Sequence, residues 1–191
     1  MKAAVFHEHG STKNIKFEEF PDPTIGPDDC LIKVKAVALN GFEPMILSKT
    51  TSLRTPLPMI PGGDIAGEIT EMGSNVDTNK WKLGDRVSIY PLIKGEGMIG
   101  ESRLGGCCEL VRVPADYLIP IPENLGDVEA ASLPVAYGTA LRMMVTRGQV
   151  QNGETVLVLG AAGGVGTACV QLARTAGCEV IACSSADWNL E

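Results

Sequence analysis

The sequence predicts a small barrel-like β domain followed by the first part of a doubly wound α/β domain. Residues 2–121 hold many short strand-like segments that are separated by Gly and Pro turns, the pattern of a small β barrel. Residues 154–183 instead follow the order strand, glycine-rich turn, helix and strand. The character changes near Pro122, so we predict a β domain at residues 1–122 and an incomplete α/β domain at 123–191.

Composition and charge exclude several classes of protein. The 191 residues are 45% hydrophobic and 20% charged, an ordinary globular balance with room for a sizeable core. A net charge of -7 opposes binding to a phosphate backbone. No apolar run reaches the length of a membrane span, and the first residues do not form a signal peptide. The six scattered cysteines suit reduced thiols. We therefore expect a cytoplasmic protein with neither nucleic acid nor membrane as its partner.

The β domain is predicted from alternating and β-branched segments between turns. Residues 31–38, for example, alternate apolar and lysine side chains, which is typical of a half-buried strand. A short helix is predicted at 42–49, and the glycine-rich residues 95–106 are predicted to form a mobile loop. The strand segments are 2–6, 16–20, 31–38, 64–73, 82–90, 108–113 and 117–121.

Helices are predicted on both sides of the glycine-rich turn. Residues 127–133 and 134–147 have helical character, with Asp127 as a possible N-cap and Pro134 suited to a first turn. After the buried strand 156–159, apolar residues recur at helical spacing from Val165, and Gly177 ends that pattern. Residues 179–183 form a second buried strand. This arrangement is a strand–helix–strand unit.

The turn of this unit matches a dinucleotide-binding fingerprint. In Ala161-x-Gly163-x-x-Gly166 an alanine replaces the first glycine, while the helix start still offers N–H groups to a pyrophosphate. The alternative is an ordinary tight turn between strand and helix. The predicted cofactor-binding residues are Ala161, Ala162, Gly163, Gly164, Val165, Gly166, Ser184 and Ser185.

The end of the second strand bears on which dinucleotide is bound. An acidic residue there would hold the ribose 2'-hydroxyl of NAD and repel a 2'-phosphate. Ser184 and Ser185 stand there instead, and small hydroxyls accept a phosphate, so the sequence favours NADPH over NAD. Asp187 lies nearby, and no Lys or Arg follows before Glu191, so NAD stays open as the alternative.

Five segments together resemble a known family. They are Pro-Gly-Gly-Asp-Ile-Ala-Gly at 61–67, Leu-Gly-Asp-Arg-Val at 83–87, Gly-Gly-Cys-Cys-Glu at 105–109, Val-Pro-Ala-Asp at 113–116 and Ala-Ala-Gly-Gly-Val-Gly at 161–166. In this order they resemble the medium-chain dehydrogenase/reductase superfamily. The resemblance implies a GroES-like catalytic domain and a Rossmann domain, with cofactor and substrate in the cleft between them.

The superfamily divides into zinc-dependent alcohol dehydrogenases and zinc-free quinone oxidoreductase-like enzymes. Catalytic zinc is typically held by Cys, His and Cys, and the corresponding positions here carry Asn40, Gly63 and Val135. A structural zinc site needs four cysteines in one loop, but only the adjacent pair Cys107 and Cys108 is present there. The two histidines, His7 and His9, are expected to be solvated rather than ligands. We therefore expect no zinc and the zinc-free branch.

Two residues match catalytic positions of that branch. Asn40, in Asn-Gly-Phe-Glu at 40–43, resembles the Asn-x-x-Asp signature, and its alternative is an Asn that caps a loop. Thr139 matches the threonine that lies against the nicotinamide, and its alternative is a helix residue bonded to its own backbone. For Tyr137 a packed aromatic is expected, and for Asp64 a carboxylate that stabilises a turn.

The resemblance implies an NADPH-dependent oxidoreductase that reduces quinones, enones or related carbonyls by hydride transfer. We expect a small-molecule substrate and a homo-oligomer, specifically a dimer. Only two strands of the doubly wound domain precede Glu191, so the chain resembles roughly the first half of such an enzyme, with reduced or no activity of its own. The alternatives are a non-catalytic nucleotide-binding or structural protein on the same fold, and an alcohol dehydrogenase-like enzyme.

Overall fold

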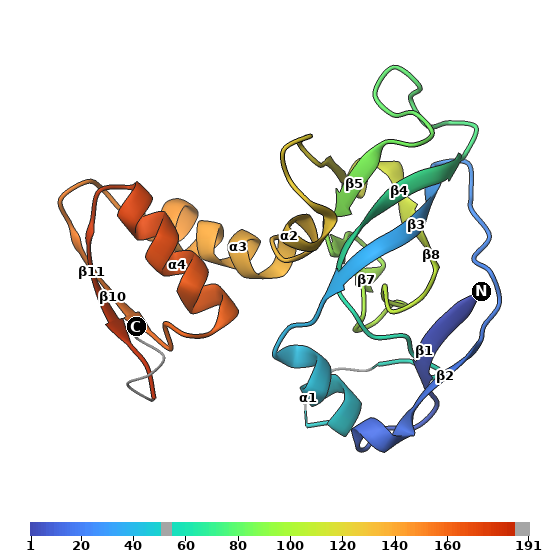
Figure 1. The fold of residues 1–191 in the computed structure, drawn as a ribbon, viewed down its shortest axis with the longest axis horizontal. Coiled ribbons are helices and arrows are strands. Elements are labelled where there is room, and N and C mark those ends of the chain that lie inside the picture. Colours follow the sequence, from blue (N-terminus) through green and yellow to red (C-terminus); the bar gives the residue numbers. More distant parts are fainter. Residues whose placement is uncertain (51–54, 186–191) are drawn as a thin grey trace. The chain divides into compact units, whose positions relative to one another are not determined.

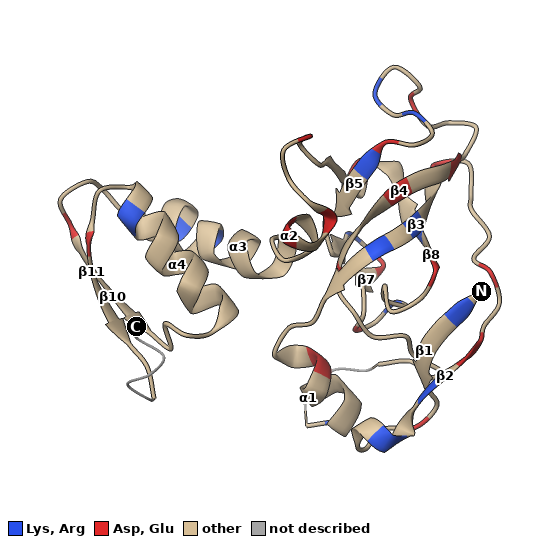
Figure 2. Cartoon of the chain, in the orientation of Figure 1, with Lys and Arg blue, Asp and Glu red and all other residues tan. Residues whose placement is uncertain are grey.

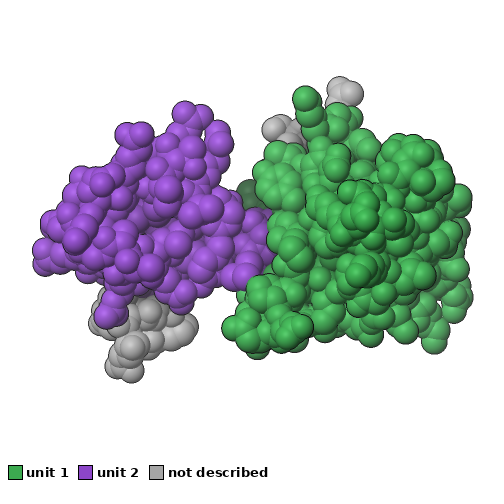
Figure 3. Space-filling view, turned by 90° about the horizontal axis from the view of Figure 1, so that it is seen from above, with its two compact units in different colours: residues 1–132 green, residues 133–191 purple. Residues whose placement is uncertain are grey.

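The computed structural model describes residues 1–50 and 55–185 of the chain (Figure 1). It forms two compact units, Met1–Ser132 and the chain from Leu133 onward, which Figure 3 shows in green and purple. The division lies beyond the boundary predicted at residue 122. The reason is helix α2 (Asp127–Ala131), whose Ala130 and Ala131 pack against Ala66 and so belong to the first unit.

An antiparallel sheet of five strands is the centre of unit 1. Its strand order is β8-β3-β4-β5-β9. The strands are β3 (Asp29–Ala38), β4 (Asp64–Met72), β5 (Arg86–Ile89), β8 (Leu110–Pro114) and β9 (Leu118–Pro120), and each lies within or beside a segment predicted as a strand. The predicted β domain is therefore confirmed.

The N-terminal strands lie beside this sheet. Strands β1 (Lys2–Phe6) and β2 (Ile15–Glu19) pair antiparallel, with the 3-10 turn η1 (Thr12–Asn14) directly before β2. Isolated bridges join Ala3 to Cys108 and Phe6 to Met59, and thereby tie β1 to later segments of the chain. The predicted short helix is α1 (Phe42–Ser48), and a further 3-10 turn, η2 (Ala115–Tyr117), precedes β9.

The glycine-rich segment corrects one prediction. Residues 95–106 were expected to form a mobile loop, but they begin within a small hairpin of β6 (Leu92–Ile93) and β7 (Gly97–Met98). Ile99 is only 1% exposed, and the Met98 N–H donates to Ser102 Oγ at 2.9 Å. Ile99 therefore anchors this segment in the core, whereas Leu104 is 41% exposed.

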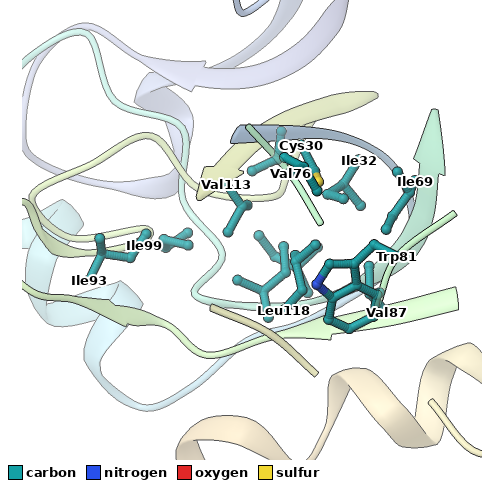
Figure 4. Packing of buried hydrophobic residues seen from close by; sticks show 13 residues of the cluster. Cys30, Ile32, Ile69, Val76, Trp81, Val87, Ile93, Ile99, Val113 and Leu118 are labelled. Carbon is teal, nitrogen blue, oxygen red and sulfur yellow. The ribbon is translucent and has the colours of Figure 1, made fainter. Parts of the chain in front are cut away.

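The main core of unit 1 lies against the five-stranded sheet (Figure 4). Trp81 is its largest member and is 3% exposed, with Ile69, Val87 and Leu118 in the same cluster. Among the described residues the Trp81 Nε1 has no hydrogen-bond partner. Burial raises the pKa of Cys30, another member, to about 11, which is the effect expected of a thiol in an apolar core.

Unit 2 is built on the predicted strand–helix–strand unit. Strand β10 (Thr155–Leu159) and strand β11 (Glu179–Cys183) pair in parallel, and α4 (Gly164–Thr175) connects them. Helix α3 (Pro134–Leu141) comes first and continues as the π-helical segment η3 (Arg142–Arg147). The prediction for this region is confirmed, with Pro134 in the first helical turn as expected.

The N-cap prediction for α2 is wrong. Gly126 holds the N-cap position, no side chain caps the helix, and Asp127 is its first residue. The Asp127 carboxylate instead accepts hydrogen bonds from Arg86 Nε at 3.0 Å and Nη2 at 2.7 Å. A partly buried guanidinium on β5 therefore replaces the helix N–H groups as the partner of this carboxylate.

The small sheet of unit 2 is covered on one face by α4. Val158 is buried with Ala168, Cys169 and Ala173 of that helix. On the other face Leu157, Leu159 and Ile181 are 58%, 75% and 49% exposed. Figure 2 shows few charged residues along these elements.

Two further expectations concern the whole described chain. No helix within residues 1–50 and 55–185 is long and apolar enough to cross a bilayer. The six cysteines are free thiols, of which Cys30 and Cys169 are buried and the other four half-buried.

Candidate functional site

The glycine turn of unit 2 joins the end of β10 to the start of α4. Gly160 turns the chain with a φ of 68°, and the Gly163 N–H donates to the Gly160 carbonyl at 3.0 Å. Ala161, which replaces the first glycine of the fingerprint, is 8% exposed and donates its N–H to the Cys183 carbonyl at 2.9 Å. An alanine is accepted here because its methyl group faces the protein interior.

Gly166 is required by close packing. A Cβ at this position would lie 2.2 Å from the Gly160 carbonyl oxygen, far inside van der Waals contact. At Gly163 and Gly164 a Cβ would meet its nearest atoms at 3.4 and 3.5 Å, which are ordinary contacts. Packing therefore demands a glycine at 166, whereas at 163 and 164 the missing side chains leave the surface of the turn open.

A cavity of about 610 Å³ lies beside this turn. The N-cap residue of α4, Gly163, carries no side chain to cap the helix, so the N–H groups of its first turn are available to an anion. The lining residues are Gly160, Ala162, Gly163, Cys183, Ser184 and Ser185. The donors and the size suit a bound pyrophosphate and ribose.

The structure divides the predicted cofactor residues by role. Ala162, Gly163, Ser184 and Ser185 line the cavity. Ala161 and Gly166 instead shape the turn by packing, while Gly164 and Val165 open the helix. Asp187, which bears on the choice of dinucleotide, lies outside the described residues.

A second polar cluster surrounds Asn40 in unit 1. Asn40 follows β3, and its Nδ2 donates to Asp64 Oδ2, at the start of β4, at 3.0 Å. Its backbone N–H donates to Glu43 Oε2 in the first turn of α1. Glu43 Oε1 accepts from the Gly63 N–H at 3.2 Å. Four residues from two parts of the sequence, 40–43 and 63–64, are thus held together by hydrogen bonds.

Burial sets the electrostatics of this cluster. Glu43 and Asp64 are 7% and 1% exposed. Desolvation raises the pKa of Glu43, while the hydrogen bonds from Asn40 and Gly63 act in the opposite direction. Burial also raises the pKa of Cys107 to about 11, with a contribution from the Glu43 carboxylate. This thiol stays protonated at neutral pH and is a poor nucleophile.

Sequence reasoning missed one part of this cluster. Glu43 was noted only as a replacement for the Asp of the Asn-x-x-Asp signature, yet it binds both Asn40 and Gly63. Asp64 was expected to stabilise a turn, and the structure adds a bond to the Asn40 side chain. The available signal was a glutamate three residues after Asn40, at the start of a predicted helix.

Thr139 and its neighbours lie in α3 of unit 2. The Thr139 side chain is exposed. Tyr137 packs against the core of unit 2 and its hydroxyl donates to Gln171 Oε1 at 2.6 Å, which confirms the packed aromatic. Asn40 belongs to unit 1 and Thr139 to unit 2.

The positions compared with zinc ligands lack the usual donors. A side chain at Gly63 would meet the Ile99 carbonyl oxygen at 3.0 Å and Phe42 Cζ at 3.2 Å, so a larger residue would require a shift of backbone. His7 pairs with Glu18 at 2.7 Å on the surface, and His9 Nδ1 lies 3.0 Å from the Ile46 carbonyl. Within the described ranges no three His, Cys, Asp or Glu side chains are grouped to hold a metal.

Comparisons with known proteins agree with this architecture. Residues 26–123 match the model of the alcohol dehydrogenase GroES-like domain. The chain is 36% identical to a 2-methylene-furan-3-one reductase of Solanum lycopersicum over 194 residues, which cover all of this chain and 49% of that protein. It is 35% identical to a quinone oxidoreductase of Mus musculus, over 95% of this chain and 51% of the other.

A solved structure extends the match to the fold. The crystal structure of an NAD-dependent alcohol dehydrogenase superposes with a TM-score of 0.92 at 31% identity, covering all of this chain and 60% of the other. The chain spans about half the length of the curated relatives it matches. With a GroES-like domain, a glycine turn at the start of a Rossmann-type unit and oxidoreductases as relatives, the chain belongs to the medium-chain dehydrogenase/reductase superfamily.

Proposed function

We propose that the protein carrying this chain is an NADPH-dependent, zinc-free reductase of quinones, enones or related carbonyls. The observation that carries the proposal is the cavity beside the glycine turn, which Ser184 and Ser185 line. Helix N–H groups suit the pyrophosphate, and two hydroxyl-bearing residues stand where an acidic residue would select NAD. Names of relatives, quinone oxidoreductase and 2-methylene-furan-3-one reductase, support this substrate class.

Unit 1 contributes the polar cluster at Asn40. When bound, NADPH supplies the hydride, and solvent supplies the proton that completes the reduction. The Asn40 side chain donates to Asp64, and Glu43 accepts from the backbone N–H groups of Asn40 and Gly63. We assign Asn40 the role of a polar contact in the substrate cleft and Thr139 that of a contact with the nicotinamide.

The absence of zinc belongs to the same proposal. Asn40 and Gly63 at the ligand positions lack the thiolate and imidazole that catalytic zinc requires. Polarisation of the substrate carbonyl then falls to hydrogen bonds. Elemental analysis of the purified protein should find no stoichiometric zinc, whereas about one tightly held zinc per chain would favour an alcohol dehydrogenase-like enzyme.

The proposal also covers the oligomeric state and the cellular compartment of the whole protein. We propose that the whole protein acts as a homodimer on a small-molecule substrate in the cytoplasm. Size-exclusion chromatography with light scattering tests the dimer.

The cofactor assignment is tested in the natural protein that carries this chain. Its reduction of a panel of quinones and enones is measured with NADPH and with NADH. Substitution Ser184→Asp should weaken NADPH binding by about 1–3 kcal/mol through repulsion of the 2'-phosphate. Ser132→Asp, on the surface of unit 1, is the matched control. Equal NADPH affinity in Ser184→Asp and wild type would overturn the assignment, and absence of turnover with every acceptor would favour a non-catalytic protein.

A further inference from the structure

Unit 1 contains a second pocket, of about 230 Å³, apart from the residues assigned above. None of the residues of the Asn40 cluster (Asn40, Glu43 and Asp64) lines this pocket. Its walls include two arginines and several apolar side chains: Arg103, Arg112, Ile60, Leu104, Leu110 and Cys108. The proposed reaction assigns no role to this pocket.

The two guanidinium groups share their counter-ion. Glu96 Oε2 lies 2.9 Å from Arg103 Nη1 and 3.5 Å from Arg112 Nη2. Arg112 Nη1 also lies 3.2 Å from Asp29 Oδ2. Glu96 is 45% exposed, so water weakens its attraction for both arginines. Arg112 therefore has two carboxylate partners, whereas Glu96 is the one that pairs with Arg103 among the described residues.

The Arg103 Nη1 is ion-paired with Glu96 but is not aligned with it for a hydrogen bond. Its side chain is 13% exposed, and among the described residues its buried Nη1 has no partner with hydrogen-bond geometry, although Glu96 is near. Burial lowers the pKa of Arg103, while the Glu96 carboxylate acts in the opposite direction and the Arg112 charge adds to the lowering. Glu96 thus neutralises this group from a poorly aligned position, and an anion in the pocket would supply an aligned acceptor.

The remaining walls are apolar. Leu104 is 41% exposed and Leu110 is half-buried, so both contribute aliphatic surface, whereas Ile60 is fully buried. Burial raises the pKa of Cys108 to about 12, so this thiol is neutral and adds no charge. A ligand that fits needs one anionic group for the arginines and an apolar body for these side chains.

We infer that this pocket binds a small organic carboxylate with an apolar chain, its carboxylate between Arg103 and Arg112 and its chain against Leu104 and Leu110. This pocket lies in unit 1 and offers guanidinium donors, whereas the nucleotide cavity lies in unit 2 and offers helix N–H groups and hydroxyls. It requires neither NADPH nor turnover, so the inference can fail while the proposed function stands.

Titration calorimetry with octanoate and with 1-octanol tests this inference in the natural protein. The two probes share the apolar chain and differ in the charged group. Octanoate should bind at least about tenfold more tightly than octanol, because charge-assisted hydrogen bonds to the arginines are formed only by the carboxylate. Equal affinity for the two probes, or no binding of octanoate, would overturn the inference.

Variants then locate the binding. Arg103→Met keeps the length of the side chain and should weaken octanoate binding about tenfold. Arg147→Met, an exposed arginine of unit 2, removes the same charge elsewhere and should leave binding unchanged. Unchanged binding in a folded Arg103→Met protein would contradict the assignment.

Glu96→Gln provides a test of opposite sign. It removes the carboxylate that competes for the two arginines, so octanoate should bind several-fold more tightly than to wild type. If the ion pairs only stabilise the fold, Glu96→Gln should instead bind octanoate more weakly than wild type or not at all. This variant and the comparison of octanoate with octanol decide the question even where Arg103→Met fails to fold, which a thermal melt detects.

Discussion

At the scale of single residues, Gly164 and Gly166 are two positions apart, but only Gly166 is required by close packing. The clash expected at Gly166 is with backbone atoms of the turn, which cannot swing aside as a side chain can. At Gly164 the nearest atom is the Ala136 Cβ at an ordinary distance. The fingerprint therefore combines one glycine that packing demands with another that packing does not.

Gly166→Ala should lower the free energy of unfolding of unit 2 by about 1–3 kcal/mol, because the start of α4 must move away from β10. Gly164→Ala is the matched control and should leave stability nearly unchanged. Urea denaturation followed by circular dichroism measures both. Equal stabilities of the two variants would show that the turn relaxes freely around residue 166.

Glu43 is expected to make stability depend on pH. Desolvation raises its folded-state pKa above the ordinary value of 4.5, so the folded chain binds more protons than the unfolded chain just above that pH. Its contribution to stability is therefore greatest below pH 4.5 and declines as pH rises through the folded-state pKa. Glu43→Gln removes this decline, although the loss of one acceptor adds a constant cost of about 1–3 kcal/mol.

The measurement is the free energy of unfolding of wild type and Glu43→Gln from pH 4.5 upward. The stability of wild type relative to the variant should fall with rising pH before it levels off. Glu8→Gln, at an exposed glutamate, serves as the control. A relative stability that rises with pH would mean that hydrogen bonds to the Glu43 carboxylate outweigh its desolvation.

At the scale of elements, α3 contains a glycine that no contact requires. Gly138 lies inside the helix, and a Cβ there would meet nothing within 4 Å. Gly153, in the turn before β10, has equally open surroundings but a φ of +85°. Substitution of Gly138 therefore tests helix propensity, and substitution of Gly153 tests the strain of an L residue at positive φ.

Gly138→Ala should raise the free energy of unfolding of unit 2 by about 0.5–1 kcal/mol, since alanine loses less backbone entropy in a helix. Gly153→Ala should lower it, because an L residue is strained at positive φ. Thermal melts of the two variants against wild type give both signs. The prediction fails where both substitutions move stability in the same direction.

At the scale of the whole molecule, the outer face of the β10–β11 sheet stands out. Leu157, Leu159 and Ile181 form an apolar strip, and among the described strands the sheet has only two members. Parallel sheets are ordinarily covered on both faces. An exposed apolar strip beside strand edges favours pairing with another chain.

The 191-residue chain by itself is therefore expected to self-associate through unit 2. The double substitution Leu157→Lys with Leu159→Lys should shift it toward monomer, since two charges on the strip oppose burial. Val128→Lys, at an apolar residue of α2 that is 72% exposed, is the control and should not shift it. Light scattering of the three proteins gives the mass, and a monodisperse wild-type monomer would contradict the expectation.

The sequence alone determined the main elements of both units, because hydrophobic periodicity and Gly and Pro turns act locally. Tertiary structure decided what depends on partners distant in sequence: Asp127 binds Arg86 rather than a helix end, and Ile99 anchors the segment 95–106, expected to be a mobile loop, in the core. The same holds for Glu43, whose two acceptor bonds join Asn40 to Gly63. Local patterns specify where a helix or strand forms, but the partner of a buried polar group depends on which segments the fold brings together.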